Sequence, residues 1–421
     1  MSLQQRDRKH IWHPLTQHKT SSDPIGIVKA KGALLFDENK NTYIDGIASW
    51  YTAMYGHCND TIIEAVCKQM QQLDQVVFTG FTHEPAVQLS EKLMAILPSN
   101  QQKIFFNDNG STAVDAAIKM AFQYYFNKGT KRNTLIAFDD GFHGDTFGAM
   151  SVSSLSVYNG PFEDFFLKVE RIPVPTAENN VEVLSKLKTI ISENDCAAFI
   201  YEPLVQGAAG MKFHSAEGLE QLLKLCKQND ILCIADEVMT GFGKTGKNFA
   251  SEYLETKPDI MCLSKALTAG VAAMSITSCT QTVFDAFLDN EIAKGFFHAH
   301  TYSANPLACA AAIAGIDLLT SEAIQGSIHR IENAHRAFSE KIIQHPKVAS
   351  VRQLGVIFAL DLNIEMERYG NLRNELFSHF MTAGVFLRPL GNTIYILPPF
   401  VISDSELQTI YTAIESCLPI V

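Results

Sequence analysis

The stretch CIADEVMTGFGKTGKNFASEYLETKPDIMCLSKALTAG, residues 233–270, decides the fold of this chain. It contains most of two short apolar runs, 231–235 and 258–263, and each run is followed by a charged side chain. The first run leads to Asp236 and the second to Lys265. Unbroken apolar runs of this length are typical of parallel strands buried on both faces. The pattern therefore predicts an open α/β sheet with an acid and a lysine at the carboxyl ends of two strands, where such sheets bind ligands.

An acid and a lysine at neighbouring strand ends are the two groups that a pyridoxal phosphate site requires. A lysine forms a Schiff base with this cofactor, and a carboxylate pairs with the pyridinium nitrogen so that the ring withdraws electrons. On their own, an Asp and a Lys at neighbouring strand ends are more often solvated caps or an ion pair than a cofactor site. The other strand ends of the chain favour the cofactor site.

A second interpretation comes from Gly241–Asn248, which is similar to the phosphate-binding loop GxxxxGK[ST]. Asn248 stands where that motif carries the hydroxyl that binds Mg²⁺, and Val238-Met-Thr240 separate the strand-end acids from the first glycine. The sequence after Asn248 does not predict a helix clearly. A P-loop nucleotide-binding protein is therefore the alternative class, and we expect this loop to be a coincidental match.

Composition narrows the class of protein further. The 421 residues carry a formal net charge of -11, so neither nucleic acid nor an anionic membrane is expected as a partner. No apolar run reaches the length of a membrane span, and the first residues lack a signal-peptide core, so we expect a cytoplasmic protein. The nine scattered cysteines fit a reducing compartment. Neither they nor the pairs His10/His13 and His298/His300 have metal-ligand spacing, so no metal site is expected.

Predicted strands and helices alternate along most of the chain. The clearest strands are 103–106, 134–138 and 197–201, and the clearest helices are 84–96, 113–126, 181–193 and 216–227. This alternation predicts the α/β class, with a mainly parallel central sheet flanked by helices. After residue 320 the pattern becomes that of a smaller α+β unit. We therefore divide the chain into an N-terminal segment with a hairpin that packs with the small domain, a large cofactor-binding domain and a small C-terminal domain, at 1–48, 49–320 and 321–421.

Polar and aromatic residues follow the other predicted strands. Gly110 and Ser111 lie in a turn that opens a helix, where free backbone N–H groups and the helix dipole favour a phosphate, although such residues also cap helices that bind nothing. Phe142 and His143 follow the next strand, and an aromatic ring between glycines can lie flat on a planar cofactor. Glu202 follows the strand after that. These groups are expected at one edge of the sheet.

Taken together, these motifs resemble those of the class III (ω-) aminotransferases of pyridoxal-phosphate fold type I. The resemblance covers most of the chain. It is carried by Gly110-Ser-Thr112, Gly141-Phe-His-Gly144, Glu202-Pro203, Ala235-Asp-Glu-Val238, Gly241-Phe-Gly-Lys-Thr-Gly246, Ser264-Lys-Ala266 and Thr301-Tyr-Ser-Ala-Asn-Pro306.

The resemblance implies a role for each candidate residue. Lys265 would form the Schiff base and carry the proton, and Asp236 would hold the pyridinium nitrogen. The other cofactor-binding residues would be Gly110, Ser111, Phe142, His143, Glu202 and, from the neighbouring subunit of a homodimer with shared sites, Thr301. The substrate-binding residues would be Trp50, Tyr51, Phe142, Ala299, His300, Arg388 and Tyr395. Trp50 and Tyr51 would wall an apolar chain, and Arg388 would pair with a substrate carboxylate.

Some motifs resemble one branch of the family, the transaminases of biotin biosynthesis. They are Ile11-Trp-His-Pro14, Ser49-Trp-Tyr51, Gly144–Met150 and Arg388–Pro399. The resemblance implies small-molecule substrates, with transfer of an amino group to 8-amino-7-oxononanoate to give 7,8-diaminononanoate. Another ω-aminotransferase, acting on ornithine, 4-aminobutyrate or a diamine, is the alternative.

Four residues depart from the family pattern. Leu15 stands where Tyr or Phe is usual, Phe142 replaces a frequent Tyr, His300 stands where Pro is common, and Lys244 replaces Arg. None of the four takes part in the core chemistry that the family implies. They bear instead on the amino donor, which is S-adenosylmethionine in most members of this branch and lysine in some.

Overall fold

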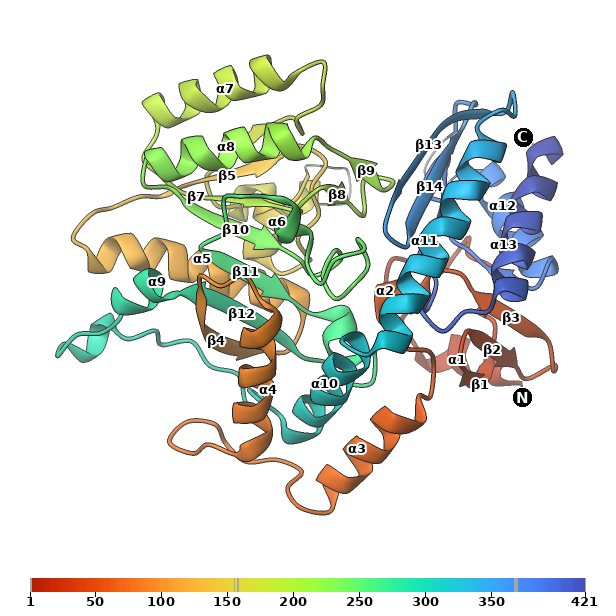
Figure 1. Ribbon diagram of the computed structural model, residues 1–421, viewed down its shortest axis with the longest axis horizontal. Helices are drawn as coiled ribbons and strands as arrows, with labels where there is room; N and C mark the ends of the chain where they lie inside the picture. The colour runs from red at the N-terminus through yellow and green to blue at the C-terminus, as the bar shows by residue number, and fades with distance from the viewer. Residues whose placement is uncertain (1, 155, 157–158, 367–369, 421) are drawn as a thin grey trace.

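The computed structural model describes residues 2–154, 156, 159–366 and 370–420 (Figure 1). Its centre is a seven-stranded sheet with the strand order β4-β12-β11-β10-β7-β5-β6. Among the described strands of this sheet, β12 alone runs antiparallel to its neighbours. The predicted α/β class with a mainly parallel sheet is thus confirmed. The strands are β4 (Gln101–Asn107), β5 (Thr134–Phe138), β6 (Val169–Ile172), β7 (Cys196–Tyr201), β10 (Leu232–Asp236), β11 (Ile260–Leu263) and β12 (Ser275–Thr280).

Each face of this sheet has its own core, because side chains alternate along a strand. In β10, Ile234 packs into the core that α5 (Gly110–Asn127) covers, and Cys233 packs into the core on the other face. That second face is covered by α7 (Asn180–Glu193) and α8 (Ala216–Gln228), which lie above the sheet in Figure 1. Burial on both faces explains why the central strands have unbroken apolar sequences.

The strand β12 was not predicted from the sequence. Its residues Ser-Ile-Thr-Ser-Cys-Thr are mostly polar, yet all six are buried. The hydroxyl of Thr277 donates to the carbonyl oxygen of Ala113 at 2.8 Å, and the hydroxyl of Ser278 donates to the side-chain oxygen of Gln101 at 2.8 Å. Internal hydrogen bonds therefore allow a hydroxyl-rich strand to be buried.

A second group of helices lies below the sheet in Figure 1. The apolar helix α10 (Pro306–Leu319) is mostly buried and packs against α3 (Asp60–Met70) and α4 (Glu84–Ile96). The remaining short helices between α5 and α10 are α6 (Phe147–Val152), α9 (Gln281–Asp285) and the 3-10 helices Gly160–Phe165, Ala250–Tyr253, Lys265–Thr268 and Ile292–Lys294. In the described part of the chain, no single helix has the length and apolarity of a membrane span. The helix α10 and the next helix, α11 (Glu322–Ile342), meet those criteria only together, across a 66° bend.

The C-terminal and N-terminal segments lie together on one side of the molecule (Figure 1). A sheet of order β13-β14-β16 packs against α11 (Glu322–Ile342), and a second sheet of order β1-β2-β3-β15 joins the two ends of the chain. The predicted hairpin is present as β2 and β3, and β1 adds a third strand that was not predicted. The other elements are α1 (Leu3–His10), β1 (Ile27–Lys31), β2 (Leu34–Asp37), β3 (Thr42–Asp45), β13 (Val348–Leu354), β14 (Ile357–Leu362), α12 (Asn371–Thr382), β15 (Val385–Phe386), β16 (Thr393–Ile396), α13 (Asp404–Cys417), the 3-10 helix Leu418–Ile420 and the short hairpin of β8 (Val205–Gln206) and β9 (Lys212–Phe213).

The turn between β13 and β14 packs tightly against the loop at residues 244–246. The backbone N–H of Val356 donates to the carbonyl oxygen of Lys244 at 3.0 Å. A Cβ atom on Gly355 would lie 2.2 Å from the backbone nitrogen of Gly246 and 2.3 Å from the carbonyl carbon of Thr245. Backbone atoms cannot move aside cheaply, so this contact requires glycine.

We expect Gly355→Ala to lower the free energy of unfolding by roughly 2–4 kcal/mol, because its φ of +57° is left-handed and its Cβ would meet backbone. Gly326→Ala is the matched control, since Gly326 is an exposed residue of α11 with nothing within 4 Å of an added Cβ. That substitution should raise stability by about 0.5–1 kcal/mol. Urea unfolding measures both. A change below about 1 kcal/mol in Gly355→Ala would contradict the packing described here.

Candidate active site

Asp236 and His143 form a buried pair at the carboxyl edge of the sheet. Asp236 is the last residue of β10, and His143 lies in the loop after β5. His143 Nδ1 lies 2.7 Å from Asp236 Oδ2, and the backbone N–H of Val238 donates to Asp236 Oδ1 at 3.1 Å. Both side chains are almost fully buried, whereas His143 Nε2 has no hydrogen-bond partner among the described residues. The carboxylate is therefore held in a fixed orientation.

Glu202 lies beside this pair, at the end of β7. Its two carboxyl oxygens accept the backbone N–H groups of Phe142 at 3.0 Å and Gly207 at 2.9 Å. Burial raises the pKa of Glu202 to about 7, and the nearby Asp236 carboxylate adds to the rise while His143 and the two amides oppose it. Glu202 thereby fixes the backbone of Phe142, whose ring is partly exposed.

Lys265 begins the 3-10 helix that follows β11 and has a left-handed φ of 51°. The preceding Ser264 is anchored by its hydroxyl, which donates to the carbonyl oxygen of Met274 at 3.0 Å. Burial lowers the pKa of the Lys265 ammonium group, and the carboxylates of Asp236 and Glu202 oppose this shift. Lys265 is therefore close to both acids and is easier to deprotonate than a solvated lysine.

The N-terminus of α5 comes close to the same strand end. A Cβ atom on Gly110 would lie 2.9 Å from Cγ1 of Val238, two residues after Asp236. The hydroxyl of Ser111 accepts the backbone N–H of Asp145 at 3.1 Å, in the loop that carries His143. The structure thus brings the predicted phosphate-binding residues to the predicted ring-binding residues.

The predicted substrate residues form a second group that adjoins the first. The guanidinium carbon of Arg388 lies 4.8 Å from the centre of the Trp50 ring, and the rings of Tyr51 and Tyr395 are 6.0 Å apart. The link between the groups is Lys265, whose Nζ lies 5.1 Å from the centre of the Tyr51 ring. The hydroxyl of Tyr395 is buried beside these residues.

Trp50 and Tyr51 are presented by an unusual backbone turn. The four residues of α2 (Ala48–Tyr51) have φ values of 46°, 47°, 61° and 71°, so this short helix is left-handed and contains no glycine. Each non-glycine residue in that conformation costs about 1–2 kcal/mol. Asp45 stabilises the turn, since its buried carboxylate accepts the hydroxyl of Ser49 at 2.9 Å, the backbone N–H of Ile47 at 3.2 Å and Nε2 of His57 at 2.8 Å.

Three predicted residues lie outside these two groups in the single chain. Ala299, His300 and Thr301 belong to the segment before α10. Nε2 of His300 lies 3.0 Å from Oδ2 of Asp108, and the carbonyl oxygen of Thr301 accepts the side-chain amide of Gln75 at 2.9 Å. Thr301 itself is exposed. Among the described residues, none of the three forms a hydrogen bond or an ion pair with Lys265.

The P-loop alternative is wrong. Gly241–Asn248 forms successive turns that end in a short 3-10 helix and not in an α-helix. The backbone N–H groups of Gly241, Gly243 and Gly246 donate within the loop, to the carbonyl oxygens of Glu237, Asn248 and Gly243. These amides are therefore not available to hold phosphates.

Two further buried charged residues lie near the site: Glu237, which was not predicted as a site residue, and Lys244, which the sequence indicated only as a departure from the family pattern. Glu237 accepts the backbone N–H of Ala250 and both the N–H and hydroxyl of Ser251. Lys244 is fully buried, and its Nζ donates to the carbonyl oxygen of Gly241 at 2.6 Å. Burial lowers the pKa of Lys244, and Lys265 lowers it further. A charged side chain within an apolar stretch was the available sequence signal, although sequence alone does not tell burial from exposure.

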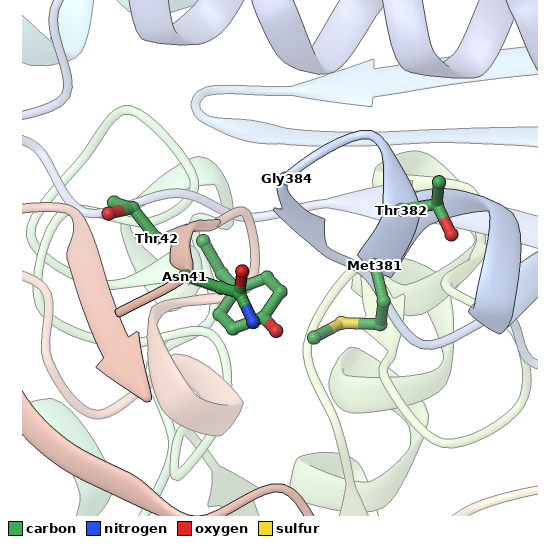
Figure 2. A pocket seen from close by; sticks show the side chains of 6 residues that line it. Asn41, Thr42, Met381, Thr382 and Gly384 are labelled. Atoms are coloured by element: carbon green, nitrogen blue, oxygen red, sulfur yellow. The ribbon is translucent and has the colours of Figure 1, made fainter. Parts of the chain in front are cut away.

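Two surface cavities lie away from these residues. Figure 2 shows one of about 380 Å³ between the β2–β3 turn, with Asn41 and Thr42, and the end of α12, with Met381 and Thr382. The other has about 340 Å³ and is lined by residues that include Arg352 and Asp361. Neither is lined by a predicted site residue, so neither is the reaction site.

Comparison with known proteins identifies the class that this site defines. The family model of class-III aminotransferases matches residues 16–418, and the chain belongs to that family. It is an aminotransferase that uses pyridoxal phosphate, as the sequence predicted.

The similar proteins match over nearly their whole length. Adenosylmethionine-8-amino-7-oxononanoate aminotransferase of Synechococcus elongatus is 43% identical, over 97% of this chain and 98% of the relative. The crystal structure of the enzyme with that name from Methanocaldococcus jannaschii has a TM-score of 0.92 at 32% identity and covers 98% of both chains. A pyridoxal-phosphate-bound amine transaminase from an uncultivated Pseudomonas species has a TM-score of 0.90 at 27% identity, over 97% of this chain and 98% of that one.

The residues present fit the cofactor of this family. A phosphate suits the start of α5, where Gly110 and Ser111 begin a helix of 18 residues. A protonated ring nitrogen suits Asp236, whose orientation His143 fixes at 2.7 Å. The partly exposed ring of Phe142 and the amine of Lys265, whose lowered pKa favours the neutral form, complete the donor set at one strand edge. The chemistry of each group matches one part of the cofactor.

We expect stability to fall as the pH rises from about 4.5 to 7. The folded protein keeps the proton of Glu202 over this range while the unfolded chain loses it, so the stabilisation present below pH 4.5 disappears as the pH passes 7. The shift corresponds to about 3 kcal/mol. Urea unfolding measures the free energy of unfolding at pH 5 and pH 8. Its fall between these two pH values should be smaller in Glu202→Gln than in wild type by about that amount. Glu217→Gln, which removes an exposed carboxylate of α8, controls for net charge; equal pH dependence in wild type and Glu202→Gln would contradict the raised pKa.

Proposed function

We propose that this aminotransferase transfers an amino group from S-adenosylmethionine to 8-amino-7-oxononanoate and so forms 7,8-diaminononanoate, a step of biotin synthesis. The observation that carries the proposal is the placement of Arg388 over Trp50, with Tyr51 and Tyr395 beside them. A fixed cation next to an apolar aromatic wall suits a substrate with a carboxylate at one end of a long apolar chain. The names of the relatives that match over the full length support the same substrate pair.

Each group of the site has a separate task in this proposal. Pyridoxal phosphate supplies, when bound, an electron-withdrawing ring that stabilises the negative charge left when a substrate carbon loses its proton. Gly110 and Ser111 hold the phosphate with the dipole of α5. Asp236 keeps a proton on the ring nitrogen, and Phe142 covers one face of the ring. Glu202 sets the position of Phe142 through its backbone N–H.

Lys265 holds the cofactor and moves the substrate proton. A neutral amine is needed for both tasks, because an ammonium group has no free electron pair. Burial, which lowers the pKa of Lys265, favours that neutral form. The amine also lies next to the Tyr51 ring, at 5.1 Å, where the substrate chain would enter. The lysine is thus placed between the cofactor-binding and substrate-binding groups.

The site is completed by a second subunit in this proposal. Ala299, His300 and Thr301 lie on an exposed segment and reach neither group in their own chain. In a homodimer with shared sites, Thr301 would contribute its hydroxyl to the partner's phosphate site, and Ala299 and His300 would border the partner's substrate. We further propose a cytoplasmic enzyme whose chain divides at residues 48 and 320, with β3 and β15 joining the N-terminal segment to the small domain.

Mixing the purified enzyme with S-adenosylmethionine and 8-amino-7-oxononanoate tests the reaction, with 7,8-diaminononanoate measured by mass spectrometry. We expect product with wild type and none above trace level with Lys265→Ala, which loses the amine that holds the cofactor and moves the proton. Ornithine, 4-aminobutyrate and diamines in place of the biotin precursor distinguish the other ω-aminotransferases. Turnover with one of these and none with 8-amino-7-oxononanoate would overturn the proposed substrate, and activity of Lys265→Ala would show that another lysine is responsible.

Arg388→Leu tests how the carboxylate is recognised. Loss of the charge-assisted contact should lower kcat/KM for 8-amino-7-oxononanoate. The corresponding loss of transition-state stabilisation should be roughly 2–5 kcal/mol. An amine substrate without a carboxylate is the control and should lose little. Equal losses for both substrates, together with a lower melting temperature, would show that Arg388 supports the fold and does not bind substrate.

A further inference from the structure

Two serines at the C-terminal end of the short helix α6, Ser151 in its last turn and Ser153 as its C-cap, make the same pattern of hydrogen bonds with different partners. The hydroxyl of Ser151 donates to the carbonyl oxygen of Phe147 at 2.6 Å and accepts the backbone N–H of Leu167 at 3.0 Å. The hydroxyl of Ser153 donates to the carbonyl oxygen of Ala149 at 2.8 Å and accepts the backbone N–H of His143 at 2.9 Å. Both serines are buried.

The partner of Ser153 is the residue that orients Asp236. The backbone N–H of His143 is held by the Ser153 hydroxyl, and the ring of the same residue meets Asp236 through Nδ1 at 2.7 Å. The neighbouring backbone N–H groups of this loop are held by other side chains, Phe142 by Glu202 at 3.0 Å and Asp145 by Ser111 at 3.1 Å, and Ser153 holds the amide of His143 itself. The direction of the His143 ring therefore depends on where Ser153 holds its amide.

Ser153 is itself held on a rigid support. Arg171 in β6 donates from Nη2 to the carbonyl oxygens of Ser151 at 2.7 Å and Ser153 at 2.9 Å. At the other end of α6, Asp115 of α5 accepts the backbone N–H of Ala149 at 2.9 Å. The helix is thus fastened to the sheet and to α5, so a contact made by Ser153 is transmitted to His143 with little freedom.

We propose that Ser153 is a positioning residue of the transamination reaction, which acts through His143 to hold Asp236 against the ring nitrogen of the cofactor. This rests on the proposed role of Asp236. Without the hydroxyl, the buried N–H of His143 loses its acceptor, and such an unsatisfied group moves toward another acceptor or toward water. A tilt of His143 would then loosen the carboxylate that keeps the ring protonated.

The paired serines provide the test. Ser153→Ala and Ser151→Ala each remove one hydroxyl with two hydrogen bonds from the same helix, so we expect similar falls in melting temperature. The expected difference is in catalysis: kcat should be about five- to tenfold lower in Ser153→Ala, with KM little changed, whereas Ser151→Ala should be close to wild type. The second readout is ¹⁵N NMR of the holoenzyme loaded with ¹⁵N-labelled pyridoxal phosphate, where the ring-nitrogen signal of Ser153→Ala should shift toward the unprotonated form.

Two further variants, Ser153→Cys and Asp236→Asn, separate the role of Ser153 from that of Asp236. Ser153→Cys places a weaker acceptor at the same position and should give intermediate values of kcat and of the ¹⁵N shift. Asp236→Asn should give the full ¹⁵N shift, since a neutral amide does not hold the ring proton. Two outcomes would overturn the role of Ser153 alone. In the first, Asp236→Asn shows the full ¹⁵N shift while Ser153→Ala keeps the wild-type kcat and ¹⁵N signal. In the second, the two serine variants lose kcat equally. No shift in Asp236→Asn would overturn the proposed role of Asp236 as well.

Discussion

The parallel pairing of β10 with β11 is the constraint on which the site depends. Asp236 stands opposite Cys262 in this pairing, so that Lys265 leaves the neighbouring strand just beyond the acid. Both faces of these strands are buried in separate cores. A register shift of one residue would turn Asp236 away from its present face and bury the wrong side chains, which is too costly to occur. Hydrophobic packing therefore fixes the distance between the two groups that the chemistry needs.

Two ionisable side chains of the site, Glu202 and Lys265, are shifted toward their uncharged forms by burial. Glu202 has a raised pKa and Lys265 a lowered one, both mainly because of burial. Each shift moves the group toward its uncharged form, which reduces the cost of placing several ionisable side chains in a dry cavity. Asp236 also has specific partners, His143 Nδ1 and the N–H of Val238. These contacts hold the carboxylate that is proposed to face the protonated ring nitrogen.

The sequence was sufficient to predict the strands and helices that local patterns of apolar residues determine. The strands around Asp236 and Lys265, the helix at Gly110 and the grouping of their side chains followed from apolar runs and strand-end residues. The strand β12 did not, because its hydroxyl groups are satisfied by partners distant in sequence, such as Ala113 for Thr277. The left-handed turn of α2 contains no glycine to reveal it and depends on Asp45. The segment at Thr301 contacts Gln75 and Asp108, which are distant from it in sequence, so local patterns do not indicate its position.

The parallel contact between β3 and β15 has a consequence for biosynthesis. Val385 pairs with Ile44, so one of the first strands to leave the ribosome completes its sheet only with one of the last. At usual rates of translation this leaves the edge of β3 uncovered for roughly tens of seconds. An uncovered strand edge is a template for wrong pairing. Newly made chains should therefore depend on chaperones more than the stability of the folded enzyme would suggest. Removing C-terminal residues, which leaves β3 without β15, should lower solubility before it disrupts the seven-stranded sheet.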